Sequence, residues 1–172
     1  MSDRVSELLV QLKKLSPMPE DDLLTEEMLD AYGEIIDELR EFIDPRSIEP
    51  LIASFGYGDG FGVYWKTLQL LEQFDDEQVA PHLIAALRHG APGARMWAAF
   101  MLGRSRNKQA IPDLIKCLHD DKEYVRVNSI LALGMIGDPI IKHNIEKLRV
   151  DPSEDVQHAV EVALSRMRDI GY

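Results

Sequence analysis

Four glycines alternate with other residues in the stretch FGYGDGFGVYW, residues 55–65, just before an aromatic pair. A glycine-rich loop can cradle a phosphate when it follows the pattern GxGxxG between a strand and a helix. Here the glycines fall at 56, 58, 60 and 62, so Phe61 occupies the place of the third glycine. The stretch therefore does not predict a nucleotide site.

The residue types that most often carry catalysis show no catalytic spacing either. The chain has neither a GxSxG nor a CxxC motif, and its single cysteine, Cys117, falls on an apolar helical stripe, where a buried structural thiol is expected. No HxxxH pair occurs among the five histidines, which are His82, His89, His119, His143 and His158. We therefore expect no catalytic residues, no metal, no cofactor and no enzyme activity.

Acidic residues are concentrated near the N-terminus. Residues 1–49 hold 14 Asp and Glu against 5 Lys and Arg, whereas residues 50–172 hold 16 against 14. This balance argues against a nucleic-acid partner, because phosphates are bound by basic side chains. It favours a basic protein partner instead.

Part of this acidity recurs at helical spacing along a long helix predicted for residues 22–43. The row is Asp22, Glu26, Asp30, Asp37, Glu41 and Asp44. It is either a solvated face of a capping helix or an electrostatic stripe that attracts a cationic partner. A metal site is a weaker third reading, because the row lacks the loop geometry of a calcium site.

Length and composition indicate one domain of ordinary size. The chain has 172 residues and a hydrophobic fraction of 45%, enough to bury a substantial core. The opening MSDRVSELLV lacks the layout of a secretory signal, and no apolar run approaches the roughly 20 residues of a membrane-spanning helix. We expect a cytoplasmic protein without a membrane partner.

An internal repeat of 31 residues predicts the fold. Pro50, Pro81 and Pro112 are each followed by an apolar run, and the same offset links Leu71, Leu102, Leu133 and Leu164. Each unit reads as two helices, with its proline in the first turn of the first helix, where the missing N–H costs no hydrogen bond. The predicted class is all-α: an α-solenoid, a right-handed superhelix of about four helix pairs behind an N-terminal helical cap. The predicted parts are a cap at 1–46 and repeats over 47–172, divided as 47–77, 78–108, 109–139 and 140–172.

The unit QAIPDLIKCLHDDKEYVRVNSILALGMIGDP resembles a HEAT repeat of the short type found in phycobilisome-lyase-like proteins. The resemblance covers roughly residues 47–170 and is strongest in the unit 109–139. Arg95 and Arg126 occupy the "VR" position of the repeat, where hydrogen bonds from one repeat to the next are favoured over contact with a ligand. Deoxyhypusine hydroxylases, another branch of HEAT proteins, hold iron with His-Glu pairs, and the string HE does not occur here. That activity, and that of DNA-glycosylase HEAT proteins with their basic groove, are not expected.

The repeat also explains the glycine run. Two steps of 31 residues carry Asp59 onto Gly90 and then onto Asp121, the position just before the second helix of each unit. Asp59 is therefore a predicted N-cap of the helix that holds Tyr64 and Trp65. The glycines around it either let the chain turn through positive φ or let a partner approach the backbone closely.

Residues of the second helices outside the core pattern should face the concave side. These include aromatic, Met and Arg side chains, which are enriched at protein interfaces. The predicted concave-face residues are Trp65, Lys66, Gln69, Met96, Trp97, Phe100, Arg104, Val127, Asn128, Leu131, Met135, His158, Val162 and Arg166. They either pack between helices or bind a partner.

Two classes of function remain open from the sequence. The first is a non-enzymatic module that binds or sequesters a partner protein through its concave face, for example an immunity-type inhibitor of a basic toxin domain. The second is a phycobilin-lyase-like or chaperone-like protein that acts on a cofactor-bearing protein, which rests on the resemblance alone. The first is favoured, because no polar group can be placed beside an open apolar pocket.

Overall fold

The structure is a computed structural model that describes residues 3–169, and every regular element in that range is helical. The first compact unit, Met1–Ala94, holds α1 (Arg4–Leu15), α2 (Glu26–Leu39), α3 (Ile48–Ser54), α4 (Tyr64–Leu71) and α5 (Asp76–His89). Short 3-10 turns precede α2, α3 and α4: η1 (Asp21–Leu23), η2 (Pro45–Ser47) and η3 (Gly60–Gly62).

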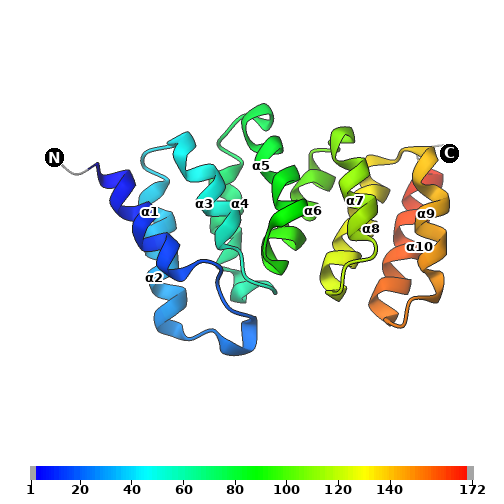
Figure 1. Cartoon of the computed structure of the whole chain (residues 1–172), viewed down its shortest axis with the longest axis horizontal. Coiled ribbons are helices and arrows are strands. Elements are labelled where there is room, and N and C mark those ends of the chain that lie inside the picture. Colours follow the sequence, from blue (N-terminus) through cyan, green and yellow to red (C-terminus); the bar gives the residue numbers. More distant parts are fainter. Residues whose placement is uncertain (1–2, 170–172) are drawn as a thin grey trace. The chain divides into compact units, whose positions relative to one another are not determined.

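The second unit, Arg95–Tyr172, contains most of α6 (Pro92–Arg104), then α7 (Ile111–Cys117), α8 (Glu123–Ile136), α9 (Lys142–Glu146) and α10 (Glu154–Asp169). Three 3-10 turns lie between these helices: η4 (Lys108–Ala110), η5 (Pro139–Ile141) and η6 (Lys147–Val150). Successive helices run as antiparallel pairs, which is plainest for α7 with α8 and α9 with α10 (Figure 1). The predicted all-α, α-solenoid class is confirmed, and no helix among the described residues is long and apolar enough to cross a membrane.

The repeated leucines are core residues. Leu71, Leu102, Leu133 and Leu164 are all buried, as the 31-residue offset predicts. In the second unit, close helix packing is repeated in the same register. A Cβ added at Gly103 would lie 2.6 Å from the Ala132 Cα, and one added at Gly134 would lie 2.7 Å from the Ala163 Cβ. These glycines let α6 approach α8, and α8 approach α10, more closely than any side chain allows.

The two repeat arginines bond forward to the next repeat, as expected. Arg95 donates to both carboxylate oxygens of Asp120 at 2.7 and 2.8 Å. Arg126 donates to both oxygens of Asp151 at 3.0 and 2.9 Å. In each pair the acid precedes the second helix of the following repeat, so each arginine fixes the spacing of successive helix pairs.

Three local predictions were wrong. Pro81 lies inside α5 instead of its first turn, because Asp75 and Gln78 form a capping box that starts the helix upstream. The helix predicted over residues 22–43 is shorter, because Thr25 accepts from the backbone N–H of Met28 and caps α2 there. The same helix ends at Leu39, and Ile43 has a positive φ of 44°.

Candidate functional site

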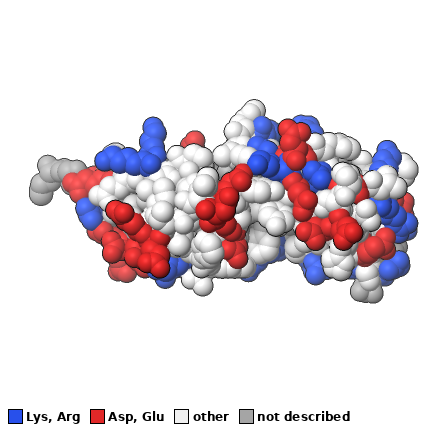
Figure 2. All heavy atoms as spheres, turned by 90° about the horizontal axis from the view of Figure 1, so that it is seen from below, with Lys and Arg blue, Asp and Glu red and all other residues white. Residues whose placement is uncertain are grey.

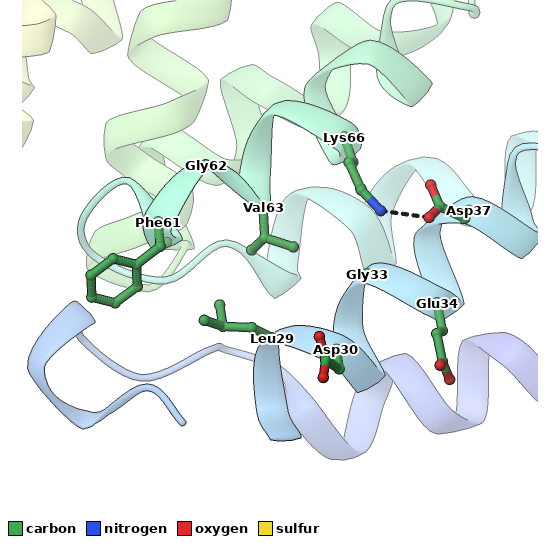
Figure 3. A pocket seen from close by; sticks show the side chains of 10 residues that line it. Leu29, Asp30, Gly33, Glu34, Asp37, Phe61, Gly62, Val63 and Lys66 are labelled. Carbon is green, nitrogen blue, oxygen red and sulfur yellow. Dashed lines mark hydrogen bonds and ion pairs between the residues drawn. The ribbon is translucent and has the colours of Figure 1, made fainter. Parts of the chain in front are cut away.

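A groove of about 610 Å³ opens on the first unit between α2 and the segment that runs from η3 into α4. Phe61, Val63 and Leu29 lie toward one end of this groove, and the carboxylates of α2 lie along the rest of it (Figure 3). The full lining is Leu29, Asp30, Gly33, Glu34, Asp37, Gly60, Phe61, Gly62, Val63 and Lys66. We call it the acidic groove.

Helix α2 presents its acids to the groove because its opposite face is fixed in the core. Asp30, Glu34 and Asp37 stand at i, i+4 and i+7, which places them along one side of the helix. On the other side Tyr32 is fully buried, and its hydroxyl lies 2.8 Å from the Ser54 Oγ and 2.7 Å from the Thr67 Oγ1. This network ties α2 to α3 and α4 and sets the rotation of α2.

The opposite wall is a loop held by two carboxylates. Asp21 accepts hydrogen bonds from the backbone N–H groups of Asp59 and Gly60, both at 3.0 Å. Asp59 accepts from the N–H of Phe61 at 2.8 Å, so the predicted cap exists, although it caps η3 and not α4 itself. The reading of the glycines as turn residues is confirmed by the positive φ of Gly60, 60°.

Phe61 itself is held in an unusual backbone conformation. Its φ is 49°, in the left-handed region that costs a side-chain-bearing residue about 1–3 kcal/mol. Phe61 is 70% exposed and lines the groove. Because the bonds from Asp21 and Asp59 fix the loop, this apolar ring stays in solvent beside the acids.

The groove carries an excess of negative charge. Lys66 places its Nζ 2.5 Å from Asp37 Oδ2, which neutralises one of the three carboxylates. Among residues 3–169, neither Asp30 nor Glu34 has a side-chain ion pair or hydrogen bond. Acidic side chains also gather over the N-terminal end of the face seen in Figure 2. Such a surface attracts cations and repels anions.

The predicted acidic stripe is only partly continuous. Glu26, Asp30 and Asp37 belong to α2, but Asp22 lies in η1, and Glu41 and Asp44 follow the end of α2. Asp44 caps η2 and pairs with Arg46 at 2.6 Å. The stripe is therefore not one helical face, and only Asp30 and Asp37 of its members line the groove.

The predicted concave-face residues differ in how far they are exposed. Met96 and Trp97 are buried, with 6% of each exposed, which favours the alternative that these two side chains pack between helices. The Trp97 ring packs edge-on against Phe100 at 5.7 Å, and the Arg104 guanidinium lies over Phe100. Trp65 is 45% exposed, and Gln69 accepts a hydrogen bond from Arg40.

The remaining predicted concave-face residues lie on α8 and α10. Val127, Leu131, His158 and Val162 line a small groove of about 280 Å³ between these helices. Asn128 donates to the Tyr124 carbonyl of its own helix at 2.8 Å. Met135 is half-buried and Arg166 is exposed, and neither lines that groove.

Sequence reasoning missed Glu34, Gly33 and Phe61 as site residues. Glu34 could have been predicted, because it lies four residues after Asp30 and three before Asp37 and so belongs to the same helical face as these two members of the acidic stripe. Phe61 carried no signal of its own, since its exposure results from the bonds that Asp21 makes across 38 and 39 residues.

Within residues 3–169 no three His, Cys, Asp or Glu side chains converge in a way that could hold a metal ion. Asp30, Glu34 and Asp37 stand one turn apart along α2, a row and not a cage. The iron expected of a deoxyhypusine hydroxylase therefore does not fit the donor set in this part of the chain.

Comparison with known proteins places this chain in a class. The family model described as HEAT repeats matches residues 80–165, half of the chain, and the chain therefore belongs to the HEAT-repeat family.

The particular relatives are enzymes. Human deoxyhypusine hydroxylase is 28% identical over 154 residues, which is 84% of this chain and 43% of the human protein. The bovine enzyme is 27% identical over the same shares, and the chicken enzyme is 35% identical over 71 residues. A solved structure of the human enzyme in complex with glycerol matches with a TM-score of 0.56 and 17% identity, covering 96% of this chain and 74% of that one. This chain spans less than half the length of the curated relatives.

These findings overturn the functional expectation. The prediction of a non-enzymatic module, a scaffold or an immunity-type inhibitor, is contradicted because the curated relatives are hydroxylases. The alternative, a phycobilin-lyase-like or chaperone-like protein, gains no support from them. The phycobilisome-lyase-like subtype is likewise not matched, although the HEAT repeat itself is.

Proposed function

We propose that this chain belongs to an enzyme that acts on a lysine-derived, cationic side chain of a protein substrate, and that the acidic groove binds that side chain. The observation that carries the proposal is the pair of carboxylates, Asp30 and Glu34, which have no ionic partner within residues 3–169 and line the groove with the exposed Phe61. The names of the relatives supply the chemical class of the substrate.

The groove has the two kinds of wall that such a side chain needs. Deoxyhypusine is a lysine side chain lengthened by an aminobutyl group, so it combines apolar methylene segments with ammonium groups. Phe61, Val63 and Leu29 offer apolar contact for methylenes, and an exposed aromatic ring also attracts an ammonium group. The carboxylates of α2 would accept the ammonium hydrogens.

The spacing of the acids suits a ligand with more than one ammonium group. Asp30 and Glu34 are four residues apart on α2, a rise of about 6 Å along the helix axis. This rise is comparable with the reach of a butyl chain. The ion pair between Lys66 and Asp37 is an example of an ammonium group bound at this wall. Because Lys66 pairs with Asp37, Asp30 and Glu34 stay available to the ligand.

The roles of the chain's residues follow from this arrangement. Asp30 and Glu34 would bind and orient the amines, Phe61 would cover the methylenes, and Gly33 would leave room at the floor of the groove. Residues 3–169 contain no cluster of side chains that could hold a metal ion. We therefore propose only a binding role for these residues and no part in a hydroxylation step.

The proposal is tested by binding of a short peptide that carries one Nε-(4-aminobutyl)lysine, measured by calorimetry at low salt. The double variant Asp30→Asn/Glu34→Gln should bind at least about tenfold more weakly, since each charged hydrogen bond contributes about 1.5–3 kcal/mol before screening by solvent. Glu27→Gln is the matched control, because Glu27 is an exposed acid of α2 that does not line the groove. Equal binding by the double variant and the control would reject the proposal.

A further inference from the structure

A second cavity lies in the first unit, away from the acidic groove. It has a volume of about 620 Å³ and lies between the end of α1, α3, α5 and the residues that lead into α6. Ile52 and Ala94 on its floor are buried, and most of its other apolar lining consists of alanines. The small size of those side chains is what leaves the space open. Its volume falls in the range of ordinary small-molecule sites, roughly 300–1,000 Å³.

The rim of this cavity differs in charge from the rest of the N-terminal region. His82 and His89 stand seven residues apart on α5, which places both imidazoles on one side of that helix. Lys13 reaches the rim from the last turn of α1. The single acid that lines the cavity is Glu49, at the start of α3.

These nitrogen groups are available to a ligand. Among residues 3–169, Lys13, His82 and His89 make no side-chain hydrogen bond or ion pair. An imidazole presents an N–H donor whether it is neutral or protonated, and a lysine ammonium presents three. Three donor-bearing side chains therefore face one acceptor-only carboxylate around an apolar floor. An amine ligand would meet these donors, whereas an anionic group can accept a hydrogen bond from each of them.

We infer that this cavity binds a small organic carboxylate with an apolar body, held by Lys13, His82 and His89 at its rim and by the alanine-lined floor below. The ligand is opposite in charge to the one proposed for the acidic groove. The inference does not depend on the proposed function, and either can fail without the other.

The test uses 4-phenylbutyrate as the probe and 4-phenylbutylamine as its charge-reversed counterpart, each titrated into the whole chain and followed by NMR. We expect the carboxylate to bind saturably and the amine to bind at least about tenfold more weakly. The variant His82→Ala removes the donor and should weaken carboxylate binding about tenfold, the effect of losing one charge-assisted hydrogen bond. His143→Ala is the matched control, since His143 is an exposed histidine on α9.

A cavity-filling variant separates this site from weak surface binding. Ala85 lines the cavity but is exposed, so Ala85→Phe should keep the helix and fill the space. We expect Ala85→Phe to abolish carboxylate binding while the circular dichroism spectrum and the unfolding midpoint stay unchanged. If Ala85→Phe does not fold, Ala53→Leu, on the α3 wall, replaces it. Absence of saturable carboxylate binding, equal binding of the amine, or parent-like binding by the filled variant would overturn the inference.

Discussion

The guanidinium of Arg126 donates hydrogen bonds to both carboxylate oxygens of Asp151, and Arg95 makes the same contact with Asp120, 31 residues earlier. Both partners of the first pair are largely buried, with 14% of the Arg126 side chain and 7% of the Asp151 side chain exposed. Burial on its own raises the pKa of Asp151, but the hydrogen bonds from Arg126 and from the Ser153 backbone N–H outweigh it and hold the pKa below its ordinary value. Each of two successive repeats thus forms one such arginine–aspartate pair, which we call a clasp.

We expect Arg126→Ala to be strongly destabilising, by about 3–5 kcal/mol, because it leaves the Asp151 carboxylate buried without its partner. Chemical denaturation measures this directly. The control is Arg149→Ala, since Arg149 and Glu161 form an exposed pair that should contribute no more than about 1 kcal/mol. Similar losses of unfolding free energy in the two variants would show that the buried pair stabilises the fold no more than an exposed pair does.

The depressed pKa of Asp151 also predicts a pH dependence. Asp151 has a lower pKa in the folded than in the unfolded chain, so the clasp stabilises the fold above the unfolded pKa of about 3.9. That contribution is lost as pH falls through the lower, folded value. We expect Asp151→Asn to lose less stability than the parent between about pH 4 and pH 2, as measured by denaturation at each pH. A parallel loss in both proteins would contradict this.

The buried leucines give a second measure of the repeat. Leu133→Ala should cost about 2–5 kcal/mol through the cavity it leaves. Val150→Ala, at a side chain that is 86% exposed, should change the unfolding midpoint little. An unchanged midpoint for Leu133→Ala would mean that the 31-residue register is misplaced.

Two glycine substitutions should act in opposite directions. Gly134→Ala should cost about 1–3 kcal/mol, since its Cβ would lie 2.7 Å from the Ala163 Cβ and force α8 and α10 apart. Gly33→Ala should stabilise the fold by up to about 1 kcal/mol, because a Cβ there meets side-chain atoms no closer than 3.5 Å and alanine favours the helix. Thermal unfolding compares them, and a loss at Gly33 as large as at Gly134 would contradict the packing described.

The hydroxyl network of Tyr32 predicts an alkaline effect. Burial raises the pKa of Tyr32 to about 12, while hydrogen bonds from Ser54 and Thr67 partly oppose it. The neutral phenol is therefore favoured by folding, and its contribution is intact below the unfolded pKa of about 10 and lost as pH rises toward 12. We expect Tyr32→Phe to be less stable than the parent at pH 7, by about 1–3 kcal/mol, yet to lose less stability between pH 10 and 12. An identical loss of stability between pH 10 and 12 in both proteins would show that Tyr32 does not cause the alkaline loss.

The sequence predicted the repeat well because its evidence is periodic. The leucines, the glycines and the clasp arginines each recur at a fixed offset. Equivalent positions of successive repeats have the same packing environment, so the pattern in one repeat predicts the structure of the next. The burial of Trp97 could not be read in this way, since an aromatic residue on a helix looks the same whether it faces solvent or the edge of Phe100.

The acidic groove could not be predicted from the sequence for a different reason. It depends on Asp21 bonding to a loop far along the chain and on α2 being rotated by the buried hydroxyl of Tyr32. Neither contact follows from local spacing. The acids themselves were visible as a charged row, but their meeting with Phe61 was not.

The most direct measurement is an NMR titration of the whole, isotope-labelled chain with the peptide that carries Nε-(4-aminobutyl)lysine. We expect the largest saturable shifts in the backbone amides of Gly33, Glu34, Phe61 and Gly62, which line both walls of the groove. The same peptide with Nε-acetyllysine in place of the cationic residue should leave these amides unmoved. Shifts confined to other parts of the chain, or the same shifts with the acetylated peptide, would contradict the assignment of the acidic groove as the site for a cationic, lysine-derived side chain.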